Sequence, residues 1–450
     1  MTSPPIDYAS LAADLVELLG ERGVSTDLST RERASVDGCR MSPILAAKLP
    51  LGIADVVAYP STAEQVGAVV AAAARYGASV TPRGKGTGNY GQGIPLNGGL
   101  VVDMSRARTI VEVGEGFITA DSGAIIAQME NAAWASGQQL LIYPSTAQST
   151  IGGFLSGGSG GTGSIAHGTI SGGPYVIALD VAHATGDADL IHVTGAAAQE
   201  YLHNFGTAGV IARVTVALEP LQPWRAFYAS FPTFPAAIAV VRALAAVTPT
   251  PRLVSADPTE LASALPADTA IPAARASVRA ILDGASIEAA SEIVLAGGGR
   301  IEEVREGSQA IMNMSMISYN HPIEWLQRAH PSTYFHVELG GDELVDRFEE
   351  VVLVYPGALL HLEGQRGRPV GMLAGIYQDE RSVLDGLDAL GRLGLSTHNP
   401  HQWNVDVAVE RTRALKAVTD PKSLLNPGKL PVPSDETAGS NPLMSTGQTS

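Results

Sequence analysis

The sequence predicts an α+β protein with two domains, and three features of the chain support this prediction. At 450 residues the chain is longer than one hydrophobic core usually supports, and 45% of its residues are hydrophobic. Short strand-like and helix-like runs alternate along its length. Two prolines in the stretch PLQPW, residues 220–224, interrupt this alternation and predict a domain boundary.

The hydrophobic pattern before the boundary predicts a mixed domain. Apolar residues at helical spacing predict helices at residues 8–22, 62–76 and 123–136. Ser61 or Thr62 is expected to cap the second helix. Short apolar runs between turn residues predict strands at residues 54–59, 79–82, 99–103, 109–113, 176–184 and 209–218.

The pattern beyond the boundary predicts a smaller α+β domain. Its expected strands are residues 226–231, 252–255, 351–355 and 370–377, and its expected helices are residues 235–246, 285–296 and 381–393. The predicted organisation is a first domain at 1–222, a second domain at 223–404, a return of 405–432 to the first domain and a disordered tail at 433–450.

The charge balance limits the possible partners. Forty-five acidic and 29 basic residues give a formal net charge of −16, which argues against nucleic acid and anionic membranes. The single cysteine, Cys39, excludes an intrachain disulfide and suits a reducing compartment. The N-terminal residues lack a signal-peptide pattern, and no apolar run is long enough to span a membrane. We therefore expect a cytoplasmic protein with a small-molecule substrate, and the sequence leaves a homo-oligomer open.

Two glycine-dense stretches predict the ligand. Residues 86–91, GTGNYG, match the G-x-G-x-x-G fingerprint, but Pro95 and further glycines follow where a Rossmann helix would have to begin. A phosphate-binding P-loop is excluded because Gly86 follows Lys85 where Ser or Thr is required. A second stretch at 144–173 has ten glycines in thirty residues. Two such stretches favour a dinucleotide whose diphosphate is bound by backbone N–H groups.

Seven motifs, taken in order, resemble one known family. They are PRGKGT, VVDMSR, YPST followed by STIGG, GSIAHG, LDVAHATGD, GTAGVIARVTVALEPL and DPKSLLNPGK. Together they resemble the vanillyl-alcohol oxidase / p-cresol methylhydroxylase (PCMH-type) superfamily, in particular FAD-linked oxidases resembling glycolate oxidase D-subunits. The resemblance covers residues 30–222 and 405–430. It implies a two-subdomain FAD-binding domain followed by a smaller α+β substrate, or cap, domain.

The resemblance also implies which residues bind FAD. The expected cofactor-binding residues are Arg83, Gly84, Lys85, Gly86 and Thr87 at the diphosphate, Ser145, Thr150, Gly152 and Gly153 along the ribityl chain and flavin, Ile211 by the adenine, and Asn426 and Lys429 near the cofactor. Arg83 and Lys85 have the alternative of being solvated loop cations, and the NPGK motif of being a plain turn.

FAD is expected to be bound noncovalently. Relatives with a covalent link through the first loop carry His where this chain has Thr87, and a second link uses a Cys in the region that matches residues 145–155. Neither is present here. A bond from His398 or His401 remains an alternative.

The stretch STHNPHQWN, residues 396–404, is the expected catalytic segment. His401 is the candidate base or proton donor, and His398 and Asn404 are candidates to orient a substrate. The alternative is that these side chains only hydrogen-bond a loop.

No catalytic metal is expected. Of the metal-binding residues of the 2-hydroxy-acid dehydrogenase branch only His361 and His398 remain, with Arg368 and Thr397 at positions of lost ligands. Arg366 and Arg368 are candidates to hold a substrate carboxylate, or are exposed loop residues.

The function implied is oxidation of a small alcohol or hydroxy acid by hydride transfer to flavin N5. The alternatives are a biosynthetic flavoenzyme doing oxidative cyclisation or a redox-neutral reaction, and a non-catalytic flavin-binding protein. The substrate and the electron acceptor stay open.

Overall fold

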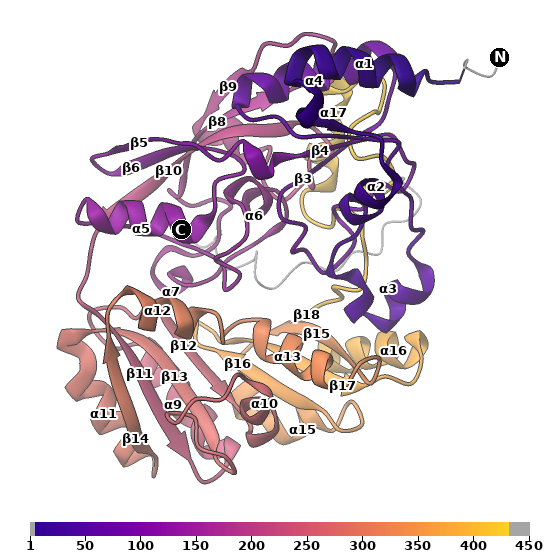
Figure 1. Cartoon of the computed structure of the whole chain (residues 1–450). Coiled ribbons are helices and arrows are strands. Elements are labelled where there is room, and N and C mark those ends of the chain that lie inside the picture. The colour runs from indigo at the N-terminus through magenta and orange to yellow at the C-terminus, as the bar shows by residue number, and fades with distance from the viewer. Residues whose placement is uncertain (1–4, 432–450) are drawn as a thin grey trace.

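The computed structural model describes residues 5–431 and contains three β-sheets (Figure 1). Helices and sheets are mixed, as predicted. The predicted tail at 433–450 lies outside the described residues. Between residues 5 and 431, no helix is both long enough and apolar enough to cross a membrane.

The first sheet has the strand order β1-β2-β4-β3, in which β2, β4 and β3 run parallel. Its strands are β1 Val24–Ser25, β2 Val56–Ala58, β3 Val80–Arg83 and β4 Leu100–Asp103. The helices of this region are α1 Tyr8–Leu19, α2 Leu28–Ala34, α3 Pro43–Lys48, α4 Ala63–Tyr76 and, from the end of the chain, α17 Val409–Thr419. Thr62 caps α4 by accepting from the Gln65 N–H, so the second of the two expected caps is used.

The second sheet has the order β5-β6-β10-β8-β9, and β7 pairs with the far end of β10. Its strands are β5 Ile110–Gly114, β6 Phe117–Asp121, β7 Gln138–Leu140, β8 Val176–Ala182, β9 Ile191–Thr194 and β10 Val210–Pro220. The helices of this part are α5 Ile126–Ala135, α6 Ile151–Gly157, α7 Ser164–His167 and α8 Gly195–Gln199.

The third sheet has eight strands in the order β14-β11-β13-β12-β16-β17-β15-β18. They are β11 Trp224–Phe231, β12 Leu253–Asp257, β13 Ala276–Asp283, β14 Arg300–Glu306, β15 Tyr334–Gly340, β16 Leu359–Glu363, β17 Val370–Ile376 and β18 Ser396–His398. The helices around it are α9 Phe234–Ala245, α10 Thr259–Ala264, α11 Ile287–Ala296, α12 Ser308–Ser315, α13 His321–Ala329, α14 Glu343–Asp346, α15 Phe348–Val352 and α16 Glu380–Arg392.

The two faces of the third sheet differ in chemistry. One face packs α9, α11, α14, α15 and α16 over a single apolar core that includes Phe335, Val337 and Leu339 of β15. Since side chains alternate along a strand, the intervening His336 and Glu338 point to the opposite face. That opposite face is turned toward the first two sheets, which lie above it in Figure 1. The fold therefore presents polar side chains to the boundary between the two parts of the chain.

Residues 405–431 run back along the first sheet. The Val80 N–H donates to the Leu424 carbonyl at 2.8 Å, and the Asn426 N–H donates to the Val80 carbonyl at 2.7 Å. The end of the described chain thus extends the edge of the sheet at β3, the strand that leads into the first glycine-dense stretch.

Two sequence-based expectations about elements are wrong. Residues 351–355 were expected as a strand, but α15 occupies 348–352, with Val351 buried and Leu353 81% exposed. A short apolar run such as VVLVY satisfies a buried strand and a helix equally, so periodicity alone does not distinguish them. The second glycine-dense stretch was expected as a loop, yet it contains α6 and α7. Thr150 caps α6 by accepting from the Gly153 N–H at 3.3 Å.

Candidate active site

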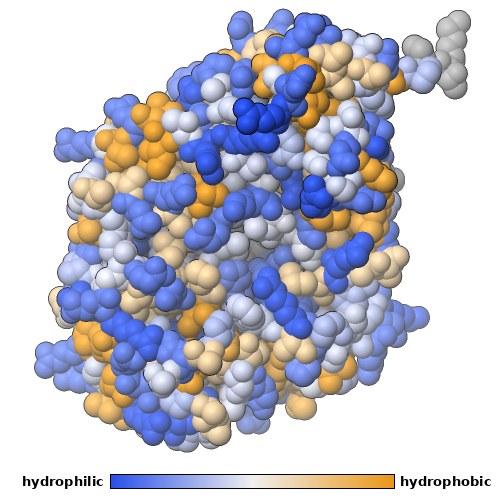
Figure 2. Space-filling view, viewed as in Figure 1, coloured by the Kyte–Doolittle hydropathy of each residue, from blue (hydrophilic) through white to orange (hydrophobic). Residues whose placement is uncertain are grey.

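A cavity of two connected chambers lies among the glycine-dense segments and the third sheet. The glycine chamber, of about 220 Å³, is lined by residues 82–88, by the start of α6 and by Ile211 of β10. The central chamber, of about 200 Å³, lies against the third sheet. Both share Thr87 and Phe154 among their lining residues, so they form one elongated space. Figure 2 shows a hollow in this face of the molecule, bordered by mixed polar and apolar residues.

Backbone forms much of the wall of the glycine chamber. A Cβ at Gly84 would lie 1.9 Å from Thr150 Oγ1, and a Cβ at Gly152 would lie 2.6 Å from the Ser122 Cβ. Neither position has room for a side chain. The Gly152 N–H is already used within the protein, because it donates to the Ser122 carbonyl at 2.8 Å, whereas the Gly84 N–H has no backbone partner among the described residues. The first glycine-dense stretch is therefore the part of this wall whose N–H groups suit a diphosphate.

The two expected cations of this chamber differ in their contacts. Arg83 donates from Nη1 to the carbonyls of Ala34 and Val36, the latter at 3.0 Å, so its guanidinium group anchors the loop to the segment after α2. Lys85 is exposed and lines the chamber without such bonds. Within the described residues, Lys85 is thus the cation of this wall that is free to meet an anion.

Asn426 and Lys429 lie behind the wall and support it. Asn426 donates to the carbonyls of Gln92 at 3.0 Å and Phe205 at 2.7 Å, and Lys429 donates to the Gly91 carbonyl. Both side chains are buried and neither lines a chamber. Burial lowers the pKa of Lys429 to about 7, although the nearby Asp37 opposes the shift.

The central chamber is bordered by a buried ion-paired triad from β15, β18 and the segment after β18. His398 Nδ1 lies 3.0 Å from Glu338 Oε2, and His398 Nε2 lies 2.5 Å from Asp406 Oδ2. Burial alone would lower the pKa of His398, but the charges and hydrogen bonds of the two carboxylates raise it to about 10. His398 is therefore an imidazolium at neutral pH, with both ring protons engaged.

Asp406 extends this cluster to the first part of the chain. Its second oxygen, Oδ1, lies 3.4 Å from His203 Nε2, and His203 Nδ1 is 2.8 Å from the Gly158 carbonyl oxygen. Burial would raise the pKa of Asp406, but its contacts with His203 and His398 hold that pKa far below its ordinary value. His203, Glu338, His398 and Asp406 all line the central chamber.

The expected base, His401, does not line the central chamber. Its ring is buried against Phe335 and His336, with ring centroids 6.1 Å and 5.6 Å away, and neither ring nitrogen has a hydrogen-bond partner among the described residues. Burial lowers its pKa to about 3. Of the expected catalytic residues, the structure places His398 and Asn404 on the chamber wall and His401 behind it.

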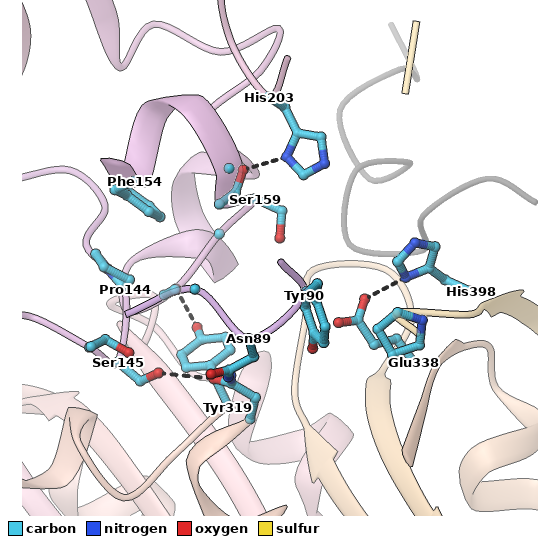
Figure 3. A pocket seen from close by; sticks show the side chains of 18 of the residues that line it. Asn89, Tyr90, Pro144, Ser145, Phe154, Ser159, His203, Tyr319, Glu338 and His398 are labelled. Atoms are coloured by element: carbon cyan, nitrogen blue, oxygen red, sulfur yellow. Dashed lines mark hydrogen bonds and ion pairs between the residues drawn. The ribbon is translucent and has the colours of Figure 1, made fainter. Parts of the chain in front are cut away.

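Tyr90, from the first glycine-dense stretch, lines the central chamber and contacts His336. Its hydroxyl lies 3.1 Å from His336 Nε2. Burial raises the pKa of the Tyr90 phenol well above 10 and lowers that of His336 to about 4, so both are neutral near pH 7. In Figure 3, Tyr90 and Glu338 border the chamber across from Pro144 and Ser145.

Polar side chains from both parts of the chain meet on the remaining wall. Glu324 Oε1 accepts from Asn89 Nδ2 and from Asn320 Nδ2, each at 2.7 Å. The Ser145 hydroxyl reaches Asn320 Oδ1 at 3.3 Å, and the Tyr319 hydroxyl donates to the Gly161 carbonyl. These bonds fix α13 against the glycine-dense segments, which gives this wall of the chamber a defined shape.

His361 and the two loop arginines lie away from the central chamber. His361 is fully buried between Asp257 and Glu363, with 2.7 Å to each. Burial opposes a charge on this ring, yet the two carboxylates raise its pKa to about 9. Arg366 and Arg368 line a separate cavity on the outer side of Gln365. Between residues 5 and 431, no group of three or more His, Cys, Asp or Glu is arranged to hold a metal ion.

Comparisons with known proteins identify the cofactor. The model of the FAD binding domain family matches residues 54–189, which include β2 to β4 and both glycine-dense stretches. Residues 54–189 form an FAD-binding domain. This match agrees with the resemblance to FAD-linked oxidases that the seven motifs indicated. FAD is thus the cofactor. The two-chambered cavity is compatible with it, because the space is elongated and one of its walls is formed by backbone.

The similarity to curated proteins is confined to part of the chain. The glycolate oxidase subunit GlcD of Bacillus subtilis (strain 168) is 30% identical over 181 residues, which is 37% of this chain and 37% of that protein. The chain therefore aligns with well under half of this relative's length.

Solved structures extend the likeness in fold to nearly the whole chain. An alkyldihydroxyacetonephosphate synthase has a TM-score of 0.73 at 16% identity and covers 96% of this chain and 87% of its own. The 4-ethylphenol oxidase from Gulosibacter chungangensis has a TM-score of 0.67 at 17% identity and covers 94% and 96%. The FAD-binding domain is thus of the PCMH type, with a second α+β part packed against it.

Sequence reasoning overlooked Glu338, Asp406, His203 and Tyr90. Tyr90 lies within the GTGNYG motif, which was considered only for phosphate binding. Glu338 follows His336 by two residues on the same strand, so the alternation of side chains along a strand places both on one face of the sheet. This spacing was the signal that could have found Glu338. His203 has no local signal, since its role depends on a contact with Asp406, 203 residues later in the chain.

Proposed function

We propose that this protein is an FAD-dependent oxidoreductase that oxidises a primary or secondary alcohol whose reacting end is uncharged. The observation that supports an alcohol rather than a 2-hydroxy acid is the charge of the central chamber. Among the described residues, no lysine or arginine lines it, and its imidazolium, His398, is already shared by two carboxylates. A carboxylate beside the reacting carbon would have to be desolvated there without a cationic partner, which is costly.

Glu338 is the proposed base for the alcohol proton. Its Oε2 accepts from His398, whereas Oε1 has no hydrogen-bond partner among the described residues, and the side chain borders the chamber. A carboxylate so placed can accept the proton of a substrate hydroxyl in the chamber. His398 holds the carboxylate in place, and Asp406 and His203 hold His398.

The neutral Tyr90 phenol is proposed to orient the substrate oxygen. Tyr90 lines the same chamber, and its hydroxyl lies 3.1 Å from His336 Nε2. With His336 Nε2–H donating to the phenol oxygen, the Tyr90 O–H would donate to a substrate hydroxyl and Glu338 would accept from it. Ser145 and Asn320 are placed to fix the rest of the substrate on the opposite wall.

The FAD would be held by the glycine chamber. Gly84 and Gly86 with Lys85, and Gly152 and Gly153 with Thr150, are the proposed contacts of the diphosphate and the chain that follows it. When bound, FAD supplies the acceptor for the hydride that leaves the alcohol carbon. The packing of α13 and Tyr90 over the central chamber would limit the access of water to that step.

Noncovalent binding of FAD is proposed as well. Both ring nitrogens of His398 are engaged by carboxylates, and His401 lies behind the chamber wall. On the wall itself, Thr87 occupies the position where covalently linked relatives carry His. Cys39 is buried, and burial raises the pKa of its thiol to about 12.

The test is reduction of the flavin by neutral alcohols without oxygen. A panel of aliphatic and benzylic alcohols is added anaerobically, and the absorbance of oxidised flavin is followed for the wild type and for Glu338→Gln. We expect the flavin absorbance to be lost in the wild type and the rate to fall about 10²-fold or more in the variant, since a general base contributes about that much. The variant should retain FAD, because Glu338 does not line the glycine chamber. Equal rates in both proteins would remove Glu338 from the mechanism.

A further inference from the structure

A third cavity, the outer cavity, adjoins the central chamber. Its volume is about 410 Å³, and it is lined by the end of α9, by residues 246–250 and by residues 364–369, the loop between β16 and β17. Gln365 lines both this cavity and the central chamber. Gln365 is therefore a residue at which the two spaces adjoin.

The outer cavity carries unneutralised positive charge. Its lining includes Arg242, Arg366 and Arg368, and no acidic residue lines it among those described. Arg242 is neutralised by Asp346 at 2.7 Å and Asp342 at 2.9 Å. Arg366 has no hydrogen bond or ion pair to the described residues, and Arg368 donates only to the Ser396 hydroxyl, at 2.6 Å. Two guanidinium groups that have no carboxylate partner among the described residues thus line one cavity of a protein whose net charge is −16.

The loop that carries these arginines is fixed at both ends. The Gly364 N–H donates to the Val254 carbonyl at 2.8 Å, and the Gly341 N–H donates to the Pro369 carbonyl at 3.0 Å. A Cβ at Gly364 would lie 3.0 Å from the Ala245 Cβ, so the loop packs directly on α9. The arginines are accordingly held at the cavity by a braced turn.

The register of β18 sets the distance from these charges to the triad. Ser396, which accepts from Arg368, precedes His398 by two residues, so both side chains point to the same face of the sheet. Two residues of a strand span about 7 Å. Because Arg368 donates to the Ser396 hydroxyl, its guanidinium group lies beside Ser396, whose backbone is about one strand repeat from that of His398.

We propose that the outer cavity binds the anionic group of an extended substrate, a carboxylate carried several carbons away from the alcohol that reacts in the central chamber. This inference rests on the proposed function and adds the substrate class to it. The central chamber favours an uncharged reacting end, and the outer cavity supplies the cations that an anion at the other end requires. Gln365 lies where the chain between the two ends would pass.

The experiment compares matched substrates in the FAD-loaded protein. 6-Hydroxyhexanoate and 1-hexanol differ in the terminal carboxylate, and glycolate carries the carboxylate beside the alcohol. The concentration for half-maximal rate of anaerobic flavin reduction is measured for each. We expect 6-hydroxyhexanoate to act at about tenfold lower concentration than 1-hexanol, because charged hydrogen bonds provide at least that factor. Glycolate is expected to be the poorest of the three.

Arginine variants locate the effect. Arg366→Gln and Arg368→Gln should each reduce the preference for 6-hydroxyhexanoate over 1-hexanol, and the double variant should abolish it while leaving 1-hexanol unchanged. Arg381→Gln, whose side chain is 89% exposed on α16, removes the same charge elsewhere and should change nothing. Arg366 is exposed and has no hydrogen bond or ion pair to residues 5–431, so Arg366→Gln is the variant expected to keep its fold.

Calorimetric titration with adipate separates the two proposals. Adipate has two carboxylates and no hydroxyl, so its binding does not depend on turnover. Binding to the wild type that is lost in the double variant supports the outer cavity, even if no alcohol reduces the flavin and the proposed function fails. Reduction by 1-hexanol, with no preference for 6-hydroxyhexanoate and no arginine-dependent binding of adipate, would overturn the outer cavity and leave the proposed function intact.

Discussion

Replacing His398 by Gln should change how the stability of the protein depends on pH. In the folded protein the pKa of His398 is about 10, against an ordinary value of 6.5. A raised pKa means that the stabilisation is fully present below pH 6.5 and is lost as the pH rises toward 10. Since one pKa unit corresponds to about 1.4 kcal/mol, the ion pairs with Glu338 and Asp406 contribute about 5 kcal/mol to the unfolding free energy at low pH.

The assay is urea unfolding of the wild type and His398→Gln at several pH values between 6 and 10, at one concentration of free FAD. Lys429 has a pKa lowered to about 7 and acts in the opposite direction, stabilising the fold as the pH rises through this range. Its contribution is common to both proteins and cancels in their difference. We expect the wild type to be more stable by about 5 kcal/mol near pH 6 and this difference to shrink toward pH 10. A difference that stays constant with pH would refute the imidazolium between two carboxylates.

Three further predictions follow from the cavity walls. Gly84→Ala should weaken FAD binding about tenfold or more, because the new Cβ would meet Thr150 Oγ1 at 1.9 Å. Gly391→Ala is the control, since an added Cβ there has open space. Equal FAD affinities of the two variants in fluorescence titration would argue against the backbone wall. His336 and His401 have pKa values lowered to about 4 and 3. Each should therefore lower the free energy of unfolding by about 2 kcal/mol when the pH falls from 6.5 to 5. In urea unfolding, His401→Phe should lose less stability than the wild type over this pH range. Acid precipitation should release all of the flavin into the supernatant, and a yellow pellet would indicate a covalent bond that these walls do not explain.

The sequence predicted the fold where local pattern and packing agree. Helix α4 is an example, because its Ala and Val residues, the Thr62 cap and the final Gly77 all favour the same element. The strand at 351–355 failed because five apolar residues carry no period, and only the packing of Val351 against the third sheet decides between helix and strand. The glycine-dense stretch at 144–173 concealed α6 because glycine lowers helix propensity, and the Thr150 cap and tertiary contacts override that tendency.

The candidate site was predictable only in part. The motifs located the FAD-binding domain, since glycine positions in a diphosphate loop leave a local pattern. The expected roles of His401 and Lys429 depended on which way each side chain points, and the packing of His401 against Phe335 is not visible in the order of residues. Glu338, Asp406 and His203 act through contacts between distant segments, and one sequence does not record such contacts.

The proposed role of Glu338 requires that it face a flavin-coupled chamber suited to the uncharged reacting end of an alcohol. The most direct measurement is the absorption spectrum of the FAD-bound protein under anaerobic conditions during the addition of 1-hexanol and then of glycolate. We expect 1-hexanol to bleach the oxidised flavin rapidly in the wild type, glycolate to do so far more slowly, and Glu338→Gln to keep its flavin oxidised with both. Rapid bleaching by glycolate, or equal bleaching of the wild type and the variant, would contradict it.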